Sequence, residues 1–369
     1  MMRDVYADHA ATTRIAPEAL EAMRPFLEDR FGNPSSVHRR GEAARAAVDA
    51  ARVQVAQLIG AAPEEIVFTS SGSEANNLAL KGVLAGAPAG RRRLVVSAIE
   101  HPSVLETARH LESHGCALTV VPVEPDGIVD PQRLAAALGP DVALVSVMWV
   151  NNEVGTIQPV RAIADAAHAA GARFHCDAVQ AAGRLAVDVE AAGADLLSLA
   201  AHKLGGPPGA AALAVRRRLR LTPLVHGGHQ ERSRRAGTEN LPALAGFGAA
   251  AARAGARLAA GEPRRLGALA EGLRERLLAA CRDTRLNGDP ARRVPAIFNL
   301  TGSACSAASP GPSHVLTAMG LRPEDAHASV RFSFGDGNDE ADMDHVFDTT
   351  PAVVERLRAL HRPAVETRS

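Results

Sequence analysis

Short runs rich in Val, Leu and Ile alternate with helical patterns between about residue 45 and residue 215. In order, these runs are Glu65–Thr69, Leu94–Ser97, Leu118–Pro122, Ala143–Val147, Gly171–Cys176 and Asp195–Leu199. A repeated strand-then-helix order is typical of a mostly parallel sheet with helices packed on it. Open sheets of this kind bind ligands at the carboxyl ends of their strands. The sequence therefore predicts an α/β fold and the edge at which its site should lie.

The length of the chain, 369 residues, is too great for one small core and suits two domains. A helix rich in Ala, Arg and Leu is expected from about residue 241 to residue 261, just before Glu262-Pro263. We interpret it as the bridge to a second, smaller α/β domain. We therefore predict a large domain over residues 15–250 and a small domain built from residues 1–14 and 251–369.

The charges balance, with 41 basic and 41 acidic residues. Nothing global then attracts nucleic acid or an anionic membrane. No apolar stretch reaches the length of a membrane span, and the first residues lack the apolar core of a signal peptide. The four cysteines show neither a disulfide framework nor a C-x-x-C metal signature, which fits a reducing compartment. We expect a cytoplasmic protein without direct nucleic-acid or membrane binding.

Two strand ends carry a lysine and a carboxylate. Asp177 closes the run that ends at Cys176, and Lys203 follows Asp195–Leu199 and precedes a Gly-rich turn. Pyridoxal phosphate needs a lysine to hold its aldehyde and a carboxylate to keep its ring nitrogen protonated, so that the ring acts as an electron sink. A lone lysine before glycines is an ordinary solvated loop residue. The pair predicts a pyridoxal phosphate site.

Other polar residues follow neighbouring strands. The turn with Gly72 and Ser73 opens a helical pattern and offers N–H groups to a phosphate, although a Gly/Ser turn alone is weak evidence. His101 suits stacking on a cofactor ring and proton exchange, but a lone strand-end histidine is often structural. Asn152 supplies an amide donor at the same edge, and Arg331 suits a bidentate clamp on a carboxylate.

Cys305 lies among small and polar residues in Gly302–Ser309, a run unsuited to a core. A thiol there is exposed and mobile, as a reactive thiol should be. The alternative is an incidental loop cysteine. The other three cysteines look structural.

Together these features resemble the cysteine desulfurases, within the class V aminotransferases. The similarity covers nearly the whole chain in ordered segments: Val5–Thr13, Phe31–His38, Thr69–Asn77, Glu100-His101, Asn151–Gly155, Asp177–Gln180, His202-Lys203, Gly227–Asn240 and Gly302–Cys305. The resemblance implies the type I fold of pyridoxal phosphate-dependent transferases, with a seven-stranded type of sheet in the large domain. It also implies a homodimer, and the Gly-Ser-Ala-Cys context resembles the branch with the longer, mobile cysteine loop.

The family pattern assigns roles around the cofactor. Lys203 is expected to form the internal aldimine, Asp177 to partner the ring nitrogen, and His101 to stack on the ring and carry protons. The remaining contacts implied are Gln180 and Asn152 to the ring hydroxyl, Gly72, Ser73, His202 and the second subunit's Thr238 to the cofactor phosphate, and Arg331 with Asn152 to the substrate carboxylate.

The implied reaction converts L-cysteine to L-alanine. Cys305 would attack the sulfur of the cysteine–cofactor adduct and take it as a persulfide. Attack on sulfur needs a thiolate, and a mobile loop lets one cysteine visit a buried cofactor and then present its persulfide to an acceptor. Iron–sulfur assembly scaffolds and transfer RNA thiolation are the uses that the resemblance implies.

Two positions depart from the family pattern. Ala200 stands where a serine usually binds the phosphate, which removes one hydrogen bond, worth roughly 1.5–3 kcal/mol. Before Thr301, roughly two dozen residues are missing, about a helix and a strand. These departures favour a second hypothesis, a desulfurase-like protein that binds cofactor or partners without turnover. A selenocysteine lyase is a further alternative.

Overall fold

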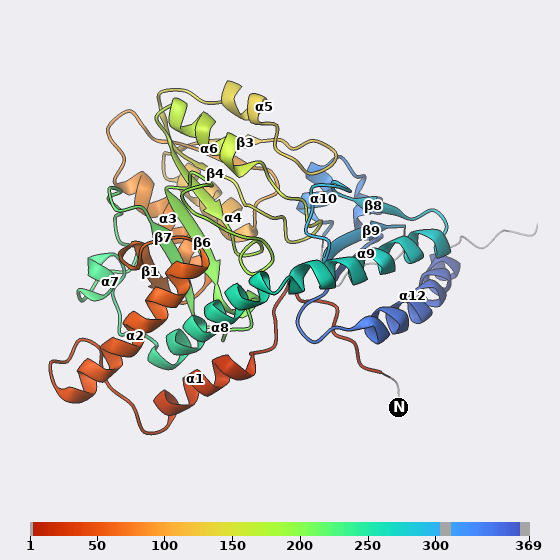
Figure 1. Cartoon of the computed structure of the whole chain (residues 1–369). Coiled ribbons are helices and arrows are strands. Elements are labelled where there is room, and N and C mark those ends of the chain that lie inside the picture. Colours follow the sequence, from red (N-terminus) through yellow and green to blue (C-terminus); the bar gives the residue numbers. More distant parts are fainter. Residues whose placement is uncertain (1–2, 303–310, 362–369) are drawn as a thin grey trace, which may run out of the picture.

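Seven strands form the central sheet of the computed structural model, which describes residues 3–302 and 311–361 (Figure 1). They are β1 (Ile66–Thr69), β2 (Arg93–Ser97), β3 (Ala117–Val121), β4 (Val142–Ser146), β5 (Arg173–Asp177), β6 (Leu196–Ala200) and β7 (Ala211–Val215). Their order across the sheet is β1-β7-β6-β5-β4-β2-β3. Only β7 runs antiparallel to its neighbours, β1 and β6. The predicted α/β fold with a mostly parallel sheet is confirmed.

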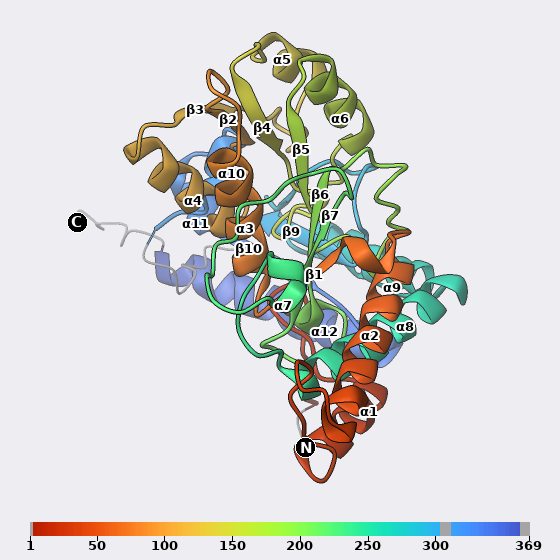
Figure 2. The same cartoon turned by 90° about the vertical axis from the view of Figure 1, so that its left-hand side faces the viewer.

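Helices cover both faces of this sheet. They are α1 (Pro17–Leu27), α2 (Arg39–Leu58), α3 (Gly72–Ala85), α4 (Pro102–Ser113), α5 (Pro131–Ala136), α6 (Val160–Ala169), α7 (Gln230–Ser233) and α8 (Leu241–Ala259), with short 3₁₀ turns at Pro63–Glu65 and Ala201–Lys203. Figure 2 shows α3 and α4 on one side of the strands and α2 and α8 on the other.

Successive strand residues face opposite sides of the sheet, so one strand serves two cores. In β1, Ile66 and Phe68 join the core under α2 and α8, whereas Val67 joins the core under α3 and α4. Strands buried on both faces need apolar side chains at every position, not at alternate ones. That requirement explains the continuous apolar runs in the sequence.

A second, three-stranded antiparallel sheet has the order β10-β9-β8. Its strands are β8 (Arg285–Asn287), β9 (Ile297–Thr301) and β10 (Ser329–Ser333), and the helices around it are α9 (Glu262–Ala280), α10 (His314–Ala318), α11 (Pro323–His327) and α12 (Glu340–His361). The N-terminal segment runs beside β10, because His9 N donates to Ser333 O at 3.0 Å and Ala10 N to Ser333 Oγ at 2.9 Å. Residues far apart in sequence therefore meet between the two sheets.

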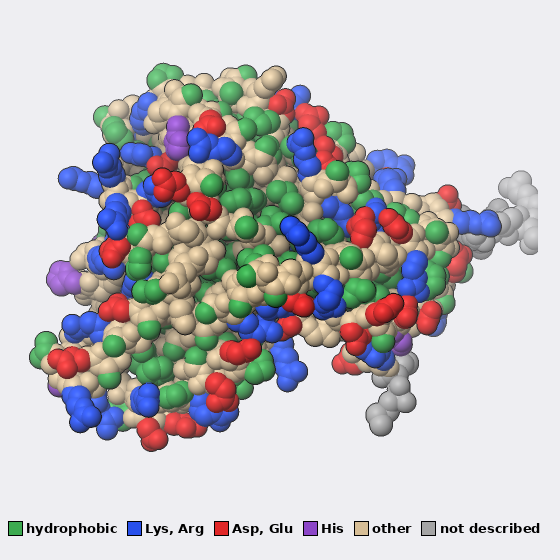
Figure 3. Space-filling view, viewed as in Figure 1, with side chains coloured by type: hydrophobic (Ala, Val, Ile, Leu, Met, Phe, Trp, Pro, Cys, Tyr) green, Lys and Arg blue, Asp and Glu red, His purple; other side chains and the backbone are tan. Residues whose placement is uncertain are grey.

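Figure 3 shows acidic and basic side chains interspersed over one face of the molecule, in line with the balanced charge count. Within residues 3–302 and 311–361, no helix combines the length and the apolar character needed to cross a membrane.

Candidate active site

Lys203 ends the 3₁₀ turn that follows β6. Its Nζ donates to the carbonyls of Ala10 and Ala11, at 2.5 Å in each case. Burial first, and then the positive charges of Arg184 and Arg331, lower the pKa of the Lys203 ammonium to about 8. A lysine must be neutral to attack an aldehyde, so this site makes the reactive form available near neutral pH.

Asp177 ends β5, the neighbour of β6, in register with Ser198. Its carboxylate is buried and accepts hydrogen bonds on both oxygens: Oδ2 from Asn76 Nδ2 at 2.7 Å and Oδ1 from Val179 N at 3.0 Å. The structure brings Asp177 and Lys203 to the same edge of the sheet, as the sequence predicts. The two hydrogen bonds fix the orientation of the carboxylate.

The Gly/Ser turn lies between β1 and α3. Ser71 caps the helix, since its Oγ accepts from Glu74 N at 3.1 Å. A Cβ at Gly72 would lie only 3.3 Å from Val179 Cγ2 and 3.5 Å from Ala200 Cβ, so the glycine keeps this helix start open. The N-terminus of a helix attracts anions.

His101 is the N-cap of α4, and its Nδ1 accepts from Ser103 N at 3.1 Å. The proton of the neutral ring is then on Nε2, the nitrogen left available. Burial lowers the pKa of His101, with a further contribution from Lys203. His202 is also held neutral, because burial followed by the Lys203 charge lowers its pKa to about 4.

Arg331, in β10, links the small sheet to the large one. Its Nη1 donates to the backbone carbonyl of Asn152 at 2.9 Å, and its Nη2 pairs with Asp8 Oδ1 at 2.5 Å. The guanidinium expected to bind a substrate carboxylate is therefore bound to a carboxylate of its own chain. A substrate has to replace Asp8 or share the guanidinium with it.

Gln180 holds the N-terminal segment through Nε2, which donates to Ala10 O at 2.8 Å. Its Oε1 is buried without a hydrogen-bond partner among the residues that the structure describes. An unpaired buried acceptor calls for a donor from outside the described residues, and a ligand hydroxyl can supply one. Together with the open turn at Gly72, it fits a phosphorylated cofactor with a ring hydroxyl.

Two expected site residues cannot be placed in this way. Thr238 is exposed on the segment between β7 and α8, and its predicted contact with a second subunit stays a prediction. Cys305 lies outside the described residues.

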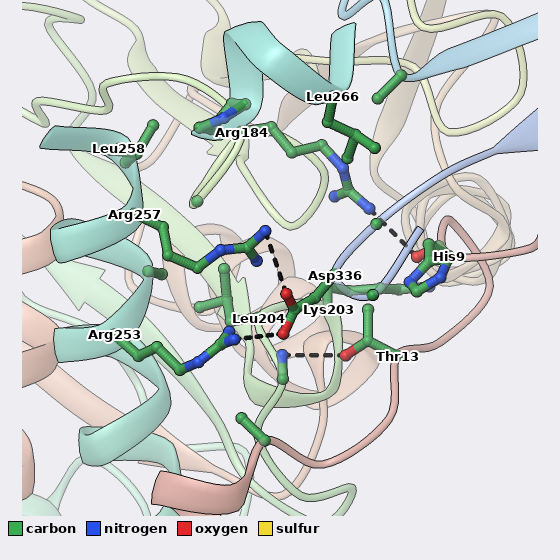
Figure 4. A pocket seen from close by; sticks show the side chains of 18 of the residues that line it. His9, Thr13, Arg184, Lys203, Leu204, Arg253, Arg257, Leu258, Leu266 and Asp336 are labelled. Carbon is green, nitrogen blue, oxygen red and sulfur yellow. Dashed lines mark hydrogen bonds and ion pairs between the residues drawn. The ribbon is translucent and has the colours of Figure 1, made fainter. Parts of the chain in front are cut away.

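Lys203 also borders a cleft of about 1310 Å³ between the N-terminal segment, α8, α9 and the small sheet (Figure 4). Arg253 and Arg257 pair with Asp336 in this cleft. Arg184 instead donates to the carbonyls of His9 and Gln180, at 3.1 and 3.3 Å. Figure 4 shows its guanidinium directed toward His9.

The sequence alone assigned no role to three residues of the site: Asn76, Glu100 and Arg184. Glu100 is fully buried, and burial raises its pKa to about 8, so that it carries a proton near neutral pH. Its Oε1 accepts from Ser97 Oγ at 2.5 Å and from Met148 N at 2.9 Å. A charged residue between an apolar strand and a histidine was the available signal for Glu100.

Comparison with known proteins defines the class first. The family described as Aminotransferase class-V matches residues 5–346, so the chain belongs to the class-V aminotransferases.

Individual relatives narrow the assignment. "Cysteine desulfurase IscS" of Dictyoglomus turgidum is 40% identical, with 98% of this chain and 97% of the relative covered. "Cysteine desulfurase" of Cereibacter sphaeroides is 43% identical, covering 97% of this chain and 98% of the relative. A solved "NifS-like protein" has a TM-score of 0.90 at 31% identity, covering 97% and 100% of the two chains. A structure titled "SspA in complex with cysteine" has a TM-score of 0.80 at 35% identity, covering 90% and 99%. Within its family, the chain stands with the cysteine desulfurases.

Proposed function

We propose that this protein is a pyridoxal phosphate-dependent cysteine desulfurase that converts L-cysteine to L-alanine and passes the sulfur to Cys305. The observation that carries the proposal is the position of Lys203 beside Asp177, with the pKa of the lysine lowered to about 8. When bound, the cofactor supplies an electron sink that weakens bonds at the substrate's α-carbon.

The residues at the sheet edge suit the parts of this cofactor. Asp177 would bind the protonated ring nitrogen, and the unpaired Oε1 of Gln180 would accept from the ring hydroxyl. Asn152 is assigned to the same hydroxyl and to the substrate carboxylate. The start of α3, at Gly72 and Ser73, would hold the phosphate. His202 and the partner subunit's Thr238 would complete the phosphate contacts in a homodimer.

Proton transfer falls to two side chains. The Nζ of Lys203 would take and return the α-proton once the substrate has replaced it, since its lowered pKa suits a base near neutral pH. The free Nε2 of His101 would carry a proton at the opposite end of the reacting group. Arg331 would bind the substrate carboxylate in place of Asp8, which keeps the guanidinium oriented until then.

The nucleophile is assigned to Cys305 from sequence alone. Described residues that follow it support the assignment: Ser313 Oγ donates to Glu153 Oε2 at 2.5 Å, and His314 Nε2 is 2.9 Å from Glu100 O. These bonds tie the chain after Cys305 to the strand ends near His101. The thiolate would attack the substrate sulfur, so that the carbon–sulfur bond breaks, a sulfur–sulfur bond forms and alanine leaves. A sulfur acceptor, such as an iron–sulfur scaffold in the cytoplasm, would receive the persulfide.

The test measures alanine and sulfide from L-cysteine with added pyridoxal phosphate and a reductant. Wild type should produce both in equal amounts. Cys305→Ser should keep the bound cofactor's colour and lose both products, whereas Lys203→Ala should lose the colour. Cys281→Ser is the matched control, because Cys281 is a buried cysteine elsewhere. Full activity in Cys305→Ser would refute the assigned nucleophile.

A cofactor-binding protein without turnover is the second candidate, favoured by Ala200 and by the proposed shortening of the small domain before Thr301. The alignment with the Dictyoglomus turgidum relative spans 382 positions, whereas this chain has 369 residues. At least some positions of the relative therefore have no counterpart here. A yellow wild-type protein that forms no alanine would identify this candidate.

A further inference from the structure

The segment between β7 and α8, residues 226–240, contains an unusual turn. Element α7 is a single left-handed turn, with φ of 45° at Glu231, 56° at Arg232 and 62° at Ser233. Residues other than glycine adopt such angles in succession only where their surroundings hold them there. The side-chain contacts of this turn therefore determine the shape of the segment, which we call the 226–240 loop.

Glu231 makes the deepest of these contacts. Its side chain is 2% exposed, and its two oxygens accept from Arg52 Nη1 and Nη2 at 2.7 Å each. Phe68 N also donates to Oε2, at 2.8 Å. Arg52 belongs to α2 and stacks 4.6 Å from the centroid of the Phe68 ring. A buried bidentate pair permits one geometry, so Glu231 docks the loop at one fixed point on α2 and β1.

Further contacts connect this docking point with the part of the loop that contains Thr238. The side chain of Gln230, the neighbour of Glu231, accepts from Gly237 N at 3.1 Å, one residue before Thr238. Arg235 pairs with Glu74, in the first turn of α3, at 2.8 Å. The loop is thus closed on itself next to Thr238. Figure 1 shows α7 at the periphery of the large sheet, away from the small sheet.

We propose that Glu231 is a positioning residue for the cofactor site of the partner subunit, because it docks the 226–240 loop in the shape that presents Thr238 to the partner. This inference rests on the proposed function in one respect, the contact of Thr238 with the phosphate across the dimer. Glu231 then supports the cofactor site whose Lys203 belongs to the partner subunit. Its loss should impair cofactor binding in the partner subunit and spare the site in its own.

Hybrid dimers test this directly. One subunit carries Lys203→Ala and the other carries Glu231→Gln, each with a different affinity tag, and the hybrid is purified through both tags. The Glu231→Gln homodimer should bind pyridoxal phosphate about tenfold more weakly than wild type, the loss expected for a phosphate contact. In the hybrid, the intact loop of the Lys203→Ala chain serves the intact Lys203 of the other chain. The hybrid should therefore bind one cofactor per dimer, at wild-type affinity and with the wild-type absorbance.

Glu231→Gln leaves Arg52 buried without the carboxylate of Glu231 and can fail to fold. The double variant Arg52→Met/Glu231→Met removes both charges and fills their space with apolar side chains. It therefore preserves the core but loses the ion pair that docks the 226–240 loop. Its homodimer should bind pyridoxal phosphate as weakly as that of Glu231→Gln, and its hybrid with Lys203→Ala should regain wild-type affinity. Glu271→Gln is the matched control: it disrupts the pair with Arg293, whose side chain is 2% exposed, far along the chain from the loop. Any loss in this control should persist in its hybrid with Lys203→Ala.

Thr238→Ala separates the positioning role of Glu231 from the contact of Thr238 across the dimer. If its hybrid with Lys203→Ala is rescued but the Glu231→Gln and double-variant hybrids are not, the positioning role of Glu231 is refuted while the contact across the dimer stands. If no hybrid is rescued although wild type binds cofactor, the contact across the dimer fails, and the inference fails with it. A wild type that binds no cofactor would overturn the proposed function itself.

Discussion

Replacing Arg184 with methionine should raise the pH at which Lys203 reacts with pyridoxal phosphate. The pKa of Lys203 falls from the usual 10.5 to about 8, through burial first and the charge of Arg184 second. At pH 7, about 10% of the amine is then neutral, compared with about 0.03% for an ordinary lysine, a gain of about 300-fold. Because burial remains in Arg184→Met, the midpoint should rise by about one pH unit, with about tenfold less neutral amine at pH 7.

The assay follows covalent attachment of the cofactor. Pyridoxal phosphate is added to apoprotein between pH 6 and 10, borohydride fixes the link to Lys203, and mass spectrometry gives its rate of formation. In wild type, the rate should rise about tenfold per pH unit and level off near pH 8. A wild-type midpoint near 10.5, or an Arg184→Met midpoint at or below that of wild type, would refute the reasoning.

Two controls separate charge from structure. Arg184→Lys keeps the positive charge and should leave the midpoint near that of wild type. Arg253→Met removes a charge from the same cleft, but Arg253 is already paired with Asp336, and the main cations that lower the pKa of Lys203 are Arg184 and Arg331. Its midpoint should not move. If Arg253→Met shifted the midpoint as far as Arg184→Met, general loss of positive charge would explain both.

Two further predictions concern buried groups near the site. The pKa of Glu100 is raised by burial from 4.5 to about 8, so its contribution to stability is present below pH 4.5 and lost as pH rises through about 8. Glu100→Gln should flatten this decline in the free energy of unfolding, which is worth up to about 5 kcal/mol. The measurement is urea unfolding of the apoprotein from pH 4 to 9. An equally steep decline in the variant would show that another group is responsible. Ala200→Ser should raise the affinity for pyridoxal phosphate by about tenfold, because a hydroxyl there lies beside Gly72 at the proposed phosphate site. A titration followed by absorbance measures this affinity, and an unchanged value would place the phosphate elsewhere.

The central sheet was predictable because burial on both faces leaves a direct mark in the sequence. The predicted run Ala143–Val147 became β4 at Val142–Ser146, and Leu94–Ser97 became β2 at Arg93–Ser97. The predicted bridging helix also appears as α8, Leu241–Ala259. By contrast, β8 is three residues long, with Arg285 exposed and Asn287 buried in polar contacts with β9. Its pairing depends on β9, which no local pattern reveals.

The positions of Lys203 and Asp177 followed from strand order, whereas their supporting contacts did not. Asn76 binds Asp177 across 101 residues of sequence, and Glu231 binds Arg52 across 179. Side chains at such separations meet only once the fold exists, so no local spacing predicts them. The left-handed turn at Glu231 is the clearest case, because its local residues contradict its backbone angles and distant partners hold it.

The contacts of the site favour an active enzyme over a relic. Gln180 Oε1 and Glu100 Oε2 are buried without hydrogen-bond partners among the described residues, and Arg184 lies half-buried with carbonyls as partners. Each arrangement costs stability, which a protein selected only to fold and to bind partners would recover by apolar substitution. In a working enzyme the same groups have uses: an acceptor for the cofactor, a neutral acid beside His101 and a cation that keeps Lys203 reactive. Costly groups kept beside a reactive lysine are what selection for catalysis maintains in a structure.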